Sequence, residues 1–181
     1  MLELSAVDCW GILGISMKSE LNMKYWLMKS EPDVYGITDL ERDRITLWDG
    51  VRNYQARNYL KSMEVGDLAF FYHSNAKPPG IVGLMHIVEA RVVDPTQFDP
   101  DSDYYDAKSS PDAPRWHTVR AEFVKKFPMI SLEILRQTFT PEELAVVRQG
   151  NRLSVLPVEK EISDRIFNLI SEQISNRTRS R

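Results

Sequence analysis

Short runs of aromatic and aliphatic residues, separated by turn-forming residues, recur along the chain from position 23 onward. Extended strands are predicted for these runs, because each is rich in strand-favouring residues and is bounded by proline, glycine or aspartate. The predicted strands cover residues 25–29, 45–48, 68–73, 81–93, 116–126 and 153–156. The run at 81–93 is apolar on both faces in its first half, as expected for a central strand.

Helical spacing of apolar residues appears between these runs. Two apolar stripes are predicted to be helix faces: Val51, Tyr54, Tyr59 and Met63 in the first, and Ile162, Ile166, Leu169 and Ile170 in a closing helix. Shorter helices are predicted after Asp33, through Leu40, after Ser131 and from Thr140 onward, because capping residues or a first-turn proline begin each segment. Strands and helices do not alternate regularly, which disfavours a doubly wound sheet. We therefore predict an α+β fold with a small mixed β-barrel and flanking helices.

Residues 1–22 differ from the rest of the chain. Their apolar run, 10–15, resembles the core of a signal peptide, but Glu3 and Asp8 precede it where positive charges belong. The run is also too short to cross a bilayer. We therefore expect 1–22 to be an extension outside the domain, with a short packed helix as the alternative. The domain is predicted to span 23–173, followed by a frayed basic tail at 174–181.

The composition fits one ordinary globular domain. The chain has 181 residues, of which 43% are hydrophobic and 27% charged. The net charge of −3 argues against coating of a long polyanion, although it permits a local basic patch. Cys9 is the only cysteine, which excludes a disulfide framework and a thiolate metal cluster. The sequence therefore favours a reducing, cytoplasmic location and predicts no membrane partner.

Signatures of catalysis are missing from the sequence. It contains no glycine-rich phosphate loop, no GxSxG elbow and no HExxH pair. His73, His86 and His117 lie in separate predicted strands without a partner at ligand spacing, and His86 is expected to be a core or surface residue. A Ser-His-Asp triad stays open, because triads are assembled in space and not in sequence. We predict no metal, no cofactor and no catalytic residue.

Residues 42–61 combine positive charges with aromatic rings. The cations are Arg42, Arg44, Arg52, Arg57 and Lys61, against only Asp43 and Asp49. Cations beside flat aromatic faces suit a nucleobase and its phosphate, although a solvated helix face would also explain the charges. Core burial is the favoured reading for Tyr54, Tyr59 and Phe70. Trp48 is expected to differ, since an adjacent Asp-Gly turn seldom buries an indole completely.

The acidic segment 94–114 is predicted to be a long loop. It contains six aspartates, four prolines and the pair Tyr104-Tyr105. Loops of this length in compact domains are usually functional or disordered. If the loop borders a binding site, it would repel a long polyanion more than it would hinder capture of one base.

Six blocks of the sequence, in order, resemble the signature of the EVE domain family. They are YWLMKSEP at 25–32, WDGVRNYQARN at 48–58, GDLAFFYHS at 66–74, GIVG at 80–83, RW at 115–116 and LSVLPV at 153–158. The resemblance covers roughly 23–172. It implies a PUA-like fold, a mixed β-barrel with helices on its flanks. It also implies recognition of a modified base, notably modified cytosine, in DNA or RNA.

The resemblance also implies which residues form the aromatic-lined base pocket. They are Lys29, Ser30, Trp48, Val51, Asn53, Phe71, Tyr72 and His73. We expect Trp48 or a strand aromatic to stack on the base and Asn53 to bind its Watson–Crick edge with a donor and an acceptor. Arg52 and Arg57 are the predicted phosphate contacts, with Lys29 as an alternative to Arg52. The oligomeric state is left open.

Two other classes of function stay open. The chain could be an amidohydrolase similar to ASCH-type enzymes that act on acylated cytidine, with Lys29 and Glu31 in the reactive cavity. Lys29 would then need a pKa lowered by burial in order to act as a base. A structural adaptor is the third possibility, and it predicts a small, empty pocket.

Overall fold

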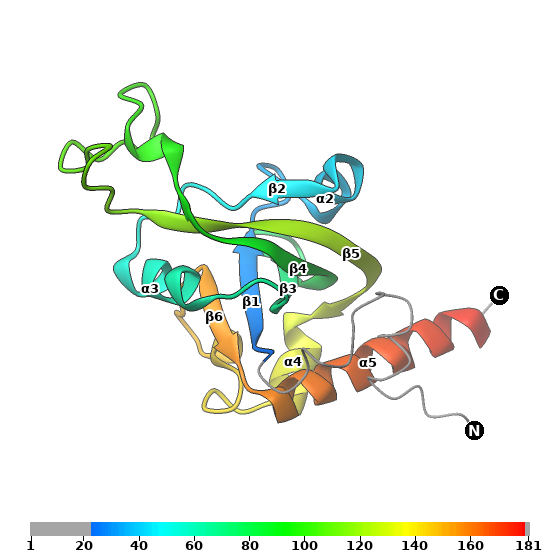
Figure 1. The fold of residues 1–181 in the computed structure, drawn as a ribbon. Helices are drawn as coiled ribbons and strands as arrows, with labels where there is room; N and C mark the ends of the chain where they lie inside the picture. Colours follow the sequence, from blue (N-terminus) through cyan, green and yellow to red (C-terminus); the bar gives the residue numbers. More distant parts are fainter. Residues whose placement is uncertain (1–22, 180–181) are drawn as a thin grey trace.

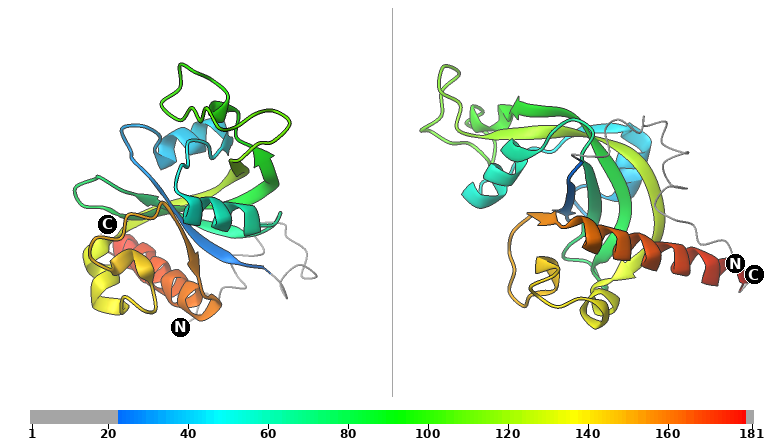
Figure 2. Two further views of the ribbon diagram at one scale, coloured as in Figure 1. Left: turned by 90° about the vertical axis from the view of Figure 1, so that its left-hand side faces the viewer. Right: turned by 60° about the horizontal axis from the view of Figure 1, so that its bottom comes forward.

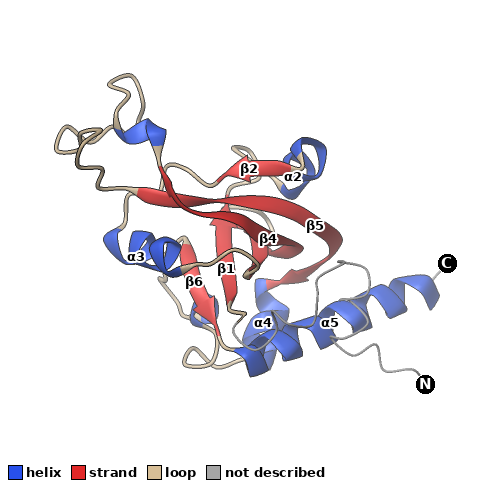
Figure 3. Cartoon of the chain, viewed as in Figure 1, coloured by secondary structure: helices blue, strands red, loops and turns tan. Residues whose placement is uncertain are grey.

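The computed structural model describes residues 23–179, so the predictions made for 1–22 lie outside the described residues. The elements, drawn in Figures 1 and 3, are β1 (Tyr25–Ser30), α2 (Ile37–Asp43), β2 (Ile45–Leu47), α3 (Tyr54–Ser62), β3 (Leu68–His73), β4 (Gly80–Val93), η2 (Pro95–Gln97), β5 (His117–Ser131), α4 (Leu132–Thr138), η3 (Ala145–Val147), β6 (Val155–Val158) and α5 (Lys160–Arg179). Each predicted strand is present.

The strands form one mixed, six-stranded sheet in the order β2-β5-β4-β3-β1-β6. β1 and β3 are parallel, with Ser30 opposite His73, and the other ladders are antiparallel. The sheet curves strongly, as Figure 2 shows. β2 and β6 are its two edges, and no ladder joins them among the described residues. The predicted α+β, PUA-like fold is therefore confirmed, with the barrel open between β2 and β6.

Alternation along β1 and β3 sends side chains into two hydrophobic clusters. Leu27 and Phe70 belong to the first cluster, which α4 and α5 cover with residues such as Leu135 and Ile166. Trp26, Met28 and Phe71 belong to the second cluster, which α2 and α3 cover with residues such as Leu40 and Leu60. The helices therefore cover both faces of the curved sheet.

Several helix boundaries differ from the sequence prediction. Gly36, and not Asp33, precedes α2, and the Asp39 carboxylate accepts a hydrogen bond from the Gly36 amide at 2.8 Å. Residues 141–143 form a turn, and the short helix η3 follows only at Ala145, while Ser131 caps α4 as predicted. The predicted tail from Ser175 onward is helical as far as Arg179, because α5 continues through it.

The buried face of α3 also corrects the predicted stripe. Ala56 and Leu60 are fully buried in this helix, whereas Tyr54 is 50% exposed. The favoured core assignment is therefore wrong for Tyr54, although it is confirmed for Phe70, which is fully buried. Met63, directly after the helix, is buried as predicted.

The loops that join these elements gather at one end of the sheet. Because β1 and β3 are parallel, the residues that follow them lie next to each other, and the Ser74 amide donates to the Ser30 carbonyl at 2.9 Å. The chain approaching β6 joins them, since the Lys29 amide donates to the Ser154 carbonyl at 2.7 Å. No helix within residues 23–179 is long and apolar enough to cross a membrane.

Candidate functional site

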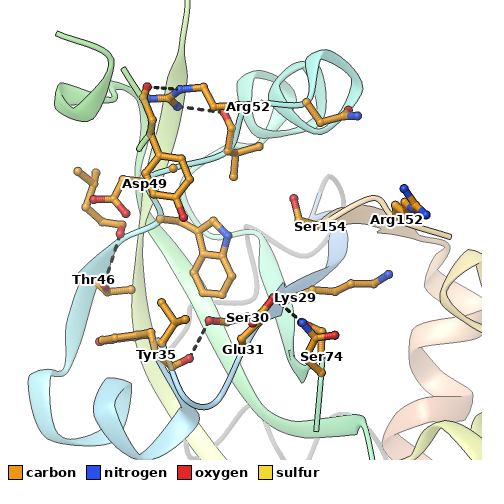
Figure 4. Close-up of a pocket in the computed structure, with 18 of the residues that line it drawn as sticks. Lys29, Ser30, Glu31, Tyr35, Thr46, Asp49, Arg52, Ser74, Arg152 and Ser154 are labelled. Carbon is orange, nitrogen blue, oxygen red and sulfur yellow. Dashed lines mark hydrogen bonds between the residues drawn. The ribbon is translucent and has the colours of Figure 1, made fainter. Parts of the chain in front are cut away.

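A pocket of about 1090 Å³ opens at this end of the sheet. Its walls come from the ends of β1 and β2, the residues after β3, the chain before β6 and one residue of the acidic loop (Figure 4). The lining residues are Lys29, Ser30, Glu31, Val34, Tyr35, Thr46, Leu47, Trp48, Asp49, Gly50, Val51, Arg52, Asn53, Ser74, Asn75, Tyr104, Asn151, Arg152 and Ser154. The adaptor alternative predicted a small pocket, whereas this pocket is as large as typical ligand pockets, which span roughly 300–1,000 Å³.

Trp48 lies between the pocket and the core. Its side chain lines the pocket, yet the residue is only 7% exposed. The indole packs edge-on against the Phe71 ring, with 5.4 Å between centroids. β5 holds the Trp48 backbone, because the Trp48 amide donates to Val119 at 3.0 Å and the Thr118 hydroxyl donates to the Trp48 carbonyl. The expectation that the turn leaves Trp48 outside the core is therefore corrected, although its indole does reach the pocket.

Asp94, the first residue of the acidic loop, is nearly fully buried behind the pocket wall. Its carboxylate accepts hydrogen bonds from the Gly50 amide at 3.0 Å and from Arg52 at 2.8 Å. Burial raises the pKa of Asp94, but the hydrogen bonds from Arg52 and Thr96 outweigh it and lower that pKa below its usual value. Asp94 therefore stays ionised at neutral pH and ties the acidic loop to the turn after Trp48.

Arg52 reinforces the connection between the acidic loop and the turn after Trp48. Its guanidinium pairs with Asp94, donates to the Tyr104 carbonyl at 2.6 Å and donates to the Thr96 hydroxyl at 2.7 Å. It also lies over the Trp116 ring, 5.2 Å from the centroid. Arg52 lines the pocket, but most of its donors bind protein groups, and its contact with a phosphate stays a prediction. It holds Tyr104 at the pocket wall.

Asp49 and Asn53 are two polar residues of the pocket lining that follow Trp48 in the sequence. The Asn53 side-chain oxygen caps α3 by accepting from the Ala56 amide at 3.0 Å, so that oxygen is already used. Asp49 forms no salt bridge with any described residue. Burial, together with the charge of Asp94, raises the pKa of the Asp49 carboxyl. A ligand would therefore find a hydrogen-bond acceptor at Asp49 and only the amide nitrogen of Asn53.

Lys29, Ser30 and Glu31 occupy the opposite wall. The Lys29 ammonium donates to the Asn151 carbonyl at 3.1 Å, and burial lowers its pKa. The Ser30 hydroxyl donates to the Tyr35 carbonyl at 2.7 Å, while the Glu31 carboxylate accepts from Asn75 at 2.7 Å. No salt bridge joins Lys29 to Glu31 in the described part of the chain.

The β3 residues predicted for the pocket lie elsewhere. Phe71 is fully buried behind Trp48, and Tyr72 faces the other cluster, under α4 and α5. His73 accepts a hydrogen bond from the Ile37 amide at 3.1 Å through Nε2, so it supports the first turn of α2. Burial lowers the pKa of His73, which favours the neutral ring that this bond requires. The structure does not bring these side chains into the pocket lining.

Arg57 lies outside the pocket, in a stack of cations and rings on α3. Its guanidinium lies over the Tyr54 ring at 4.8 Å, and that ring stacks on Trp116 with 5.0 Å between centroids. Arg115 joins the stack through a bond to the Tyr54 hydroxyl at 2.5 Å. The stack fastens the end of the acidic loop to α3.

Several pocket residues escaped the sequence analysis, notably Asp49, Tyr104 and Arg152. Tyr104 could be noticed as an aromatic residue in an otherwise polar loop, but nothing local indicated that the loop folds back onto Gly50. Arg152 lies more than a hundred residues from Lys29 in the chain, and pairing of β6 with β1 brings the two together. Within residues 23–179, no group of three or more side chains has the makings of a metal site.

Comparisons with known proteins agree with the fold. Residues 24–169 match the family model described as EVE domain. Thymocyte nuclear protein 1 of Homo sapiens is 41% identical over 170 residues, which cover 83% of this chain and 76% of that protein. A crystal structure from Pseudomonas putida is 49% identical, with a TM-score of 0.77, and covers 80% of this chain and 98% of the other. The human THYN1 protein in complex with 5-methylcytosine containing DNA is 41% identical, with a TM-score of 0.75, and covers 81% of this chain and 96% of the other.

Proposed function

The chain belongs to the EVE domain family, and we propose on that basis that it binds one modified cytosine of a nucleic acid in the pocket beside Trp48. The observation that carries this proposal is the pocket itself. It is large enough for a nucleotide and combines an indole, a tyrosine ring and an acceptor within one wall. The human relative solved with 5-methylcytosine containing DNA supports the same chemistry.

Trp48 and Tyr104 supply the flat surfaces of the proposed site. Both line the pocket, and Tyr104 is held there by its contact with Gly50 and by the bond from Arg52 to its carbonyl. Stacking of one base on an aromatic side chain contributes about 1–3 kcal/mol. Val51 and Leu47 add apolar lining. We infer that these groups enclose the base and its methyl substituent.

Asp49 supplies the base-reading acceptor in this proposal. Cytosine presents an exocyclic amine, whereas thymine presents a carbonyl oxygen at the same position. The Asp49 carboxylate forms no ion pair among the described residues, so it can accept from that amine. The Asn53 amide nitrogen can donate to an acceptor of the base, since its oxygen is engaged in capping α3. A cytosine therefore fits this pair better than a thymine.

The proposed ligand is a single base that is extruded from the stacked bases of the nucleic acid. A single base is proposed because the Trp48 and Tyr104 rings and the Asp49 acceptor in the pocket lining can all contact one base. Extrusion from a duplex costs a few kcal/mol, so an unpaired modified base should bind better than a paired one. DNA is the carrier favoured by the human relative's complex, and RNA is the alternative. The cytoplasmic location stays a prediction, and the matched curated relative is named as a nuclear protein.

Hydrolysis of an acylated cytidine is the less supported alternative. The lowered pKa of Lys29 suits a base, but its ammonium binds the Asn151 carbonyl, while Glu31 binds Asn75. In the described structure, Lys29 and Glu31 therefore do not form the acid–base pair that this reaction requires. Incubation with acylated and alkylated cytidines, scored for released product, separates a catalyst from a binding module.

The direct test is a set of oligonucleotides that differ at one position. Single strands carrying 5-methylcytosine, cytosine or thymine at that position, and duplexes of the same sequences, are titrated against the protein. The proposal requires the tightest binding for unpaired 5-methylcytosine and the weakest for thymine. Equal affinities across the set would contradict it, as would a preference for duplexes whatever the base.

A further inference from the structure

Charges in the pocket are divided between two opposite sides. Asp49 and the Arg52–Asp94 pair lie on the side formed by the residues after β2 and by the acidic loop. Lys29 and Arg152 lie on the other side, and Figure 4 shows both of them away from Asp49 and Arg52. One side is therefore acidic or neutralised, whereas the other carries two positive charges and one carboxylate, Glu31, which binds Asn75.

The backbone around Arg152 is fixed next to the Lys29 ammonium. Lys29 donates to the carbonyl of Asn151, the residue before Arg152, at 3.1 Å. The Asn151 side chain in turn accepts from the Leu153 amide at 2.9 Å and donates to the Ala145 carbonyl at 2.7 Å. Arg152 is thus presented from a short, hydrogen-bonded turn while its side chain stays exposed.

Neither cation has an anionic partner in the described structure. No carboxylate of residues 23–179 forms a salt bridge with Lys29 or Arg152. Glu31, which shares this wall, places its carboxylate on Asn75 instead. Both cations line the pocket, so an anion that enters it would be attracted to this wall. The pocket therefore has a place for a negative charge beside the place for a base.

We propose that Lys29 and Arg152 form a phosphate subsite that binds a backbone phosphate flanking the captured base. This rests on the proposed function. A nucleotide has the same polarity as the pocket, because its base carries an amine that suits Asp49 and its phosphate is anionic. Lysine binds phosphate as a point charge, and arginine can bind it with two parallel hydrogen bonds. The subsite takes over the role predicted for Arg52 and Arg57, since Arg52 is paired with Asp94 and Arg57 does not line the pocket.

Replacing one backbone phosphate with an uncharged methylphosphonate tests this subsite, because the replacement removes the negative charge that the subsite is proposed to bind. The probe is a single strand with one 5-methylcytosine, prepared with ordinary phosphates, with a methylphosphonate 5′ to that base, or with a methylphosphonate 3′ to it. The proteins are wild type, Arg152→Ala, Lys29→Met and the control Arg148→Ala. Arg148 is an exposed arginine of the same connecting segment, but it does not line the pocket.

One of the two methylphosphonates should weaken wild-type binding about tenfold, the size of one charge-assisted hydrogen bond. Arg152→Ala should bind the all-phosphate strand about tenfold more weakly and should lose part of this sensitivity, because one of the two positive charges is gone. Lys29→Met should behave in the same way. Because Lys29 is half-buried, its variant is included only if circular dichroism shows a native fold. Arg148→Ala should match wild type.

The outcomes separate the subsite from the base pocket. If wild type prefers 5-methylcytosine over cytosine but Arg152→Ala keeps the full sensitivity to the methylphosphonate, the subsite is overturned and base recognition stands. If wild type shows no preference for 5-methylcytosine, the proposed function fails and the subsite fails with it.

Discussion

The ring of Tyr104 lies directly against Gly50, so closely that a Cβ at Gly50 would stand 2.7 Å from the ring. Gly50 has φ +75°, a left-handed conformation that side chains rarely adopt. One glycine therefore allows both the turn after Trp48 and the approach of a residue from the acidic loop. This contact, with the Arg52–Asp94 pair behind it, makes the loop part of the pocket wall.

Gly50→Ala should displace Tyr104 as well as strain the turn. Gly66 offers the control, because it also has a positive φ, +97°, but open space where its Cβ would be, and it does not line the pocket. A left-handed alanine costs about 1–3 kcal/mol of stability in either position. Only Gly50→Ala should also weaken binding of the 5-methylcytosine strand. Urea unfolding and binding titrations on both variants measure the two effects, and equal binding by both would show that the Tyr104 contact is dispensable.

Asp94→Asn should remove the charge that fixes the acidic loop. Breaking one partner of a largely buried ion pair costs about 3 kcal/mol, because the Arg52 charge is left without its partner. Asp112→Asn is the control, since Asp112 is exposed in the same loop and forms no salt bridge in the described structure. Unfolding free energies at pH 7 that are equal for both variants would contradict this role.

The pH dependence of stability follows from the same carboxylate. Asp94 has a lowered pKa in the folded protein, so its stabilising contribution is complete above the unfolded value of about 3.9 and is lost as the pH falls through the folded pKa. Wild type should therefore lose this contribution only in strong acid, and Asp94→Asn should lack that step. Unfolding curves collected from pH 7 into strong acid, well below the unfolded pKa of about 3.9, compare the two proteins.

The strands could be predicted from the sequence because their apolar alternation is local. Helix starts were less predictable, and α2 shows why. Its first amide is bound by His73, which lies 36 residues away, and Asp39 closes a capping box on Gly36. Asp33 is a good cap by its chemistry, but a distant partner decides where the helix begins.

Part of the candidate site was implied by the family resemblance and not by local alternation. Lys29, Trp48 and Val51 lie within the blocks that carry the resemblance, and all three line the pocket. The positions of Tyr104 and Arg152 at the pocket could not be predicted, because each is set by an interaction between distant segments. The Arg52–Asp94 ion pair places Tyr104, and the pairing of β6 with β1 places Arg152. Tyr72 was misplaced relative to the pocket because the alternation of β3 directs it into the opposite cluster.

Trp48→Ala should weaken base binding and also destabilise the fold, because the indole is 7% exposed and packs on Phe71. Deleting a large core aromatic costs about 3–5 kcal/mol. Phe123→Ala should destabilise the domain by a similar amount but leave binding intact, since Phe123 belongs to the core and not to the pocket lining. Titrations well below each melting temperature separate the effects. If Trp48→Ala bound the base with wild-type affinity, Trp48 would not be part of the binding site.

Asp49→Asn should reduce discrimination between 5-methylcytosine and thymine. The asparagine amide can donate to the thymine carbonyl, whereas the carboxylate can only accept. The pKa of Asp49 is raised by burial and by Asp94, so wild-type binding of 5-methylcytosine should weaken as the pH falls through that raised pKa. Affinities of both proteins for both strands, measured as a function of pH, check this. Unchanged selectivity in the variant would exclude Asp49 as the reader.

The most direct test of base capture compares two neighbouring tyrosines. Tyr104 and Tyr105 are 43% and 45% exposed, but only Tyr104 lines the pocket. The measurement is the affinity of wild type, Tyr104→Ala and Tyr105→Ala for an unpaired 5-methylcytosine and for cytosine in the same strand. Loss of one stacking surface, worth about 1–3 kcal/mol, should weaken binding of 5-methylcytosine by Tyr104→Ala about tenfold or more. Tyr105→Ala should bind like wild type, and equal affinities in all three proteins would contradict binding of the base in this pocket.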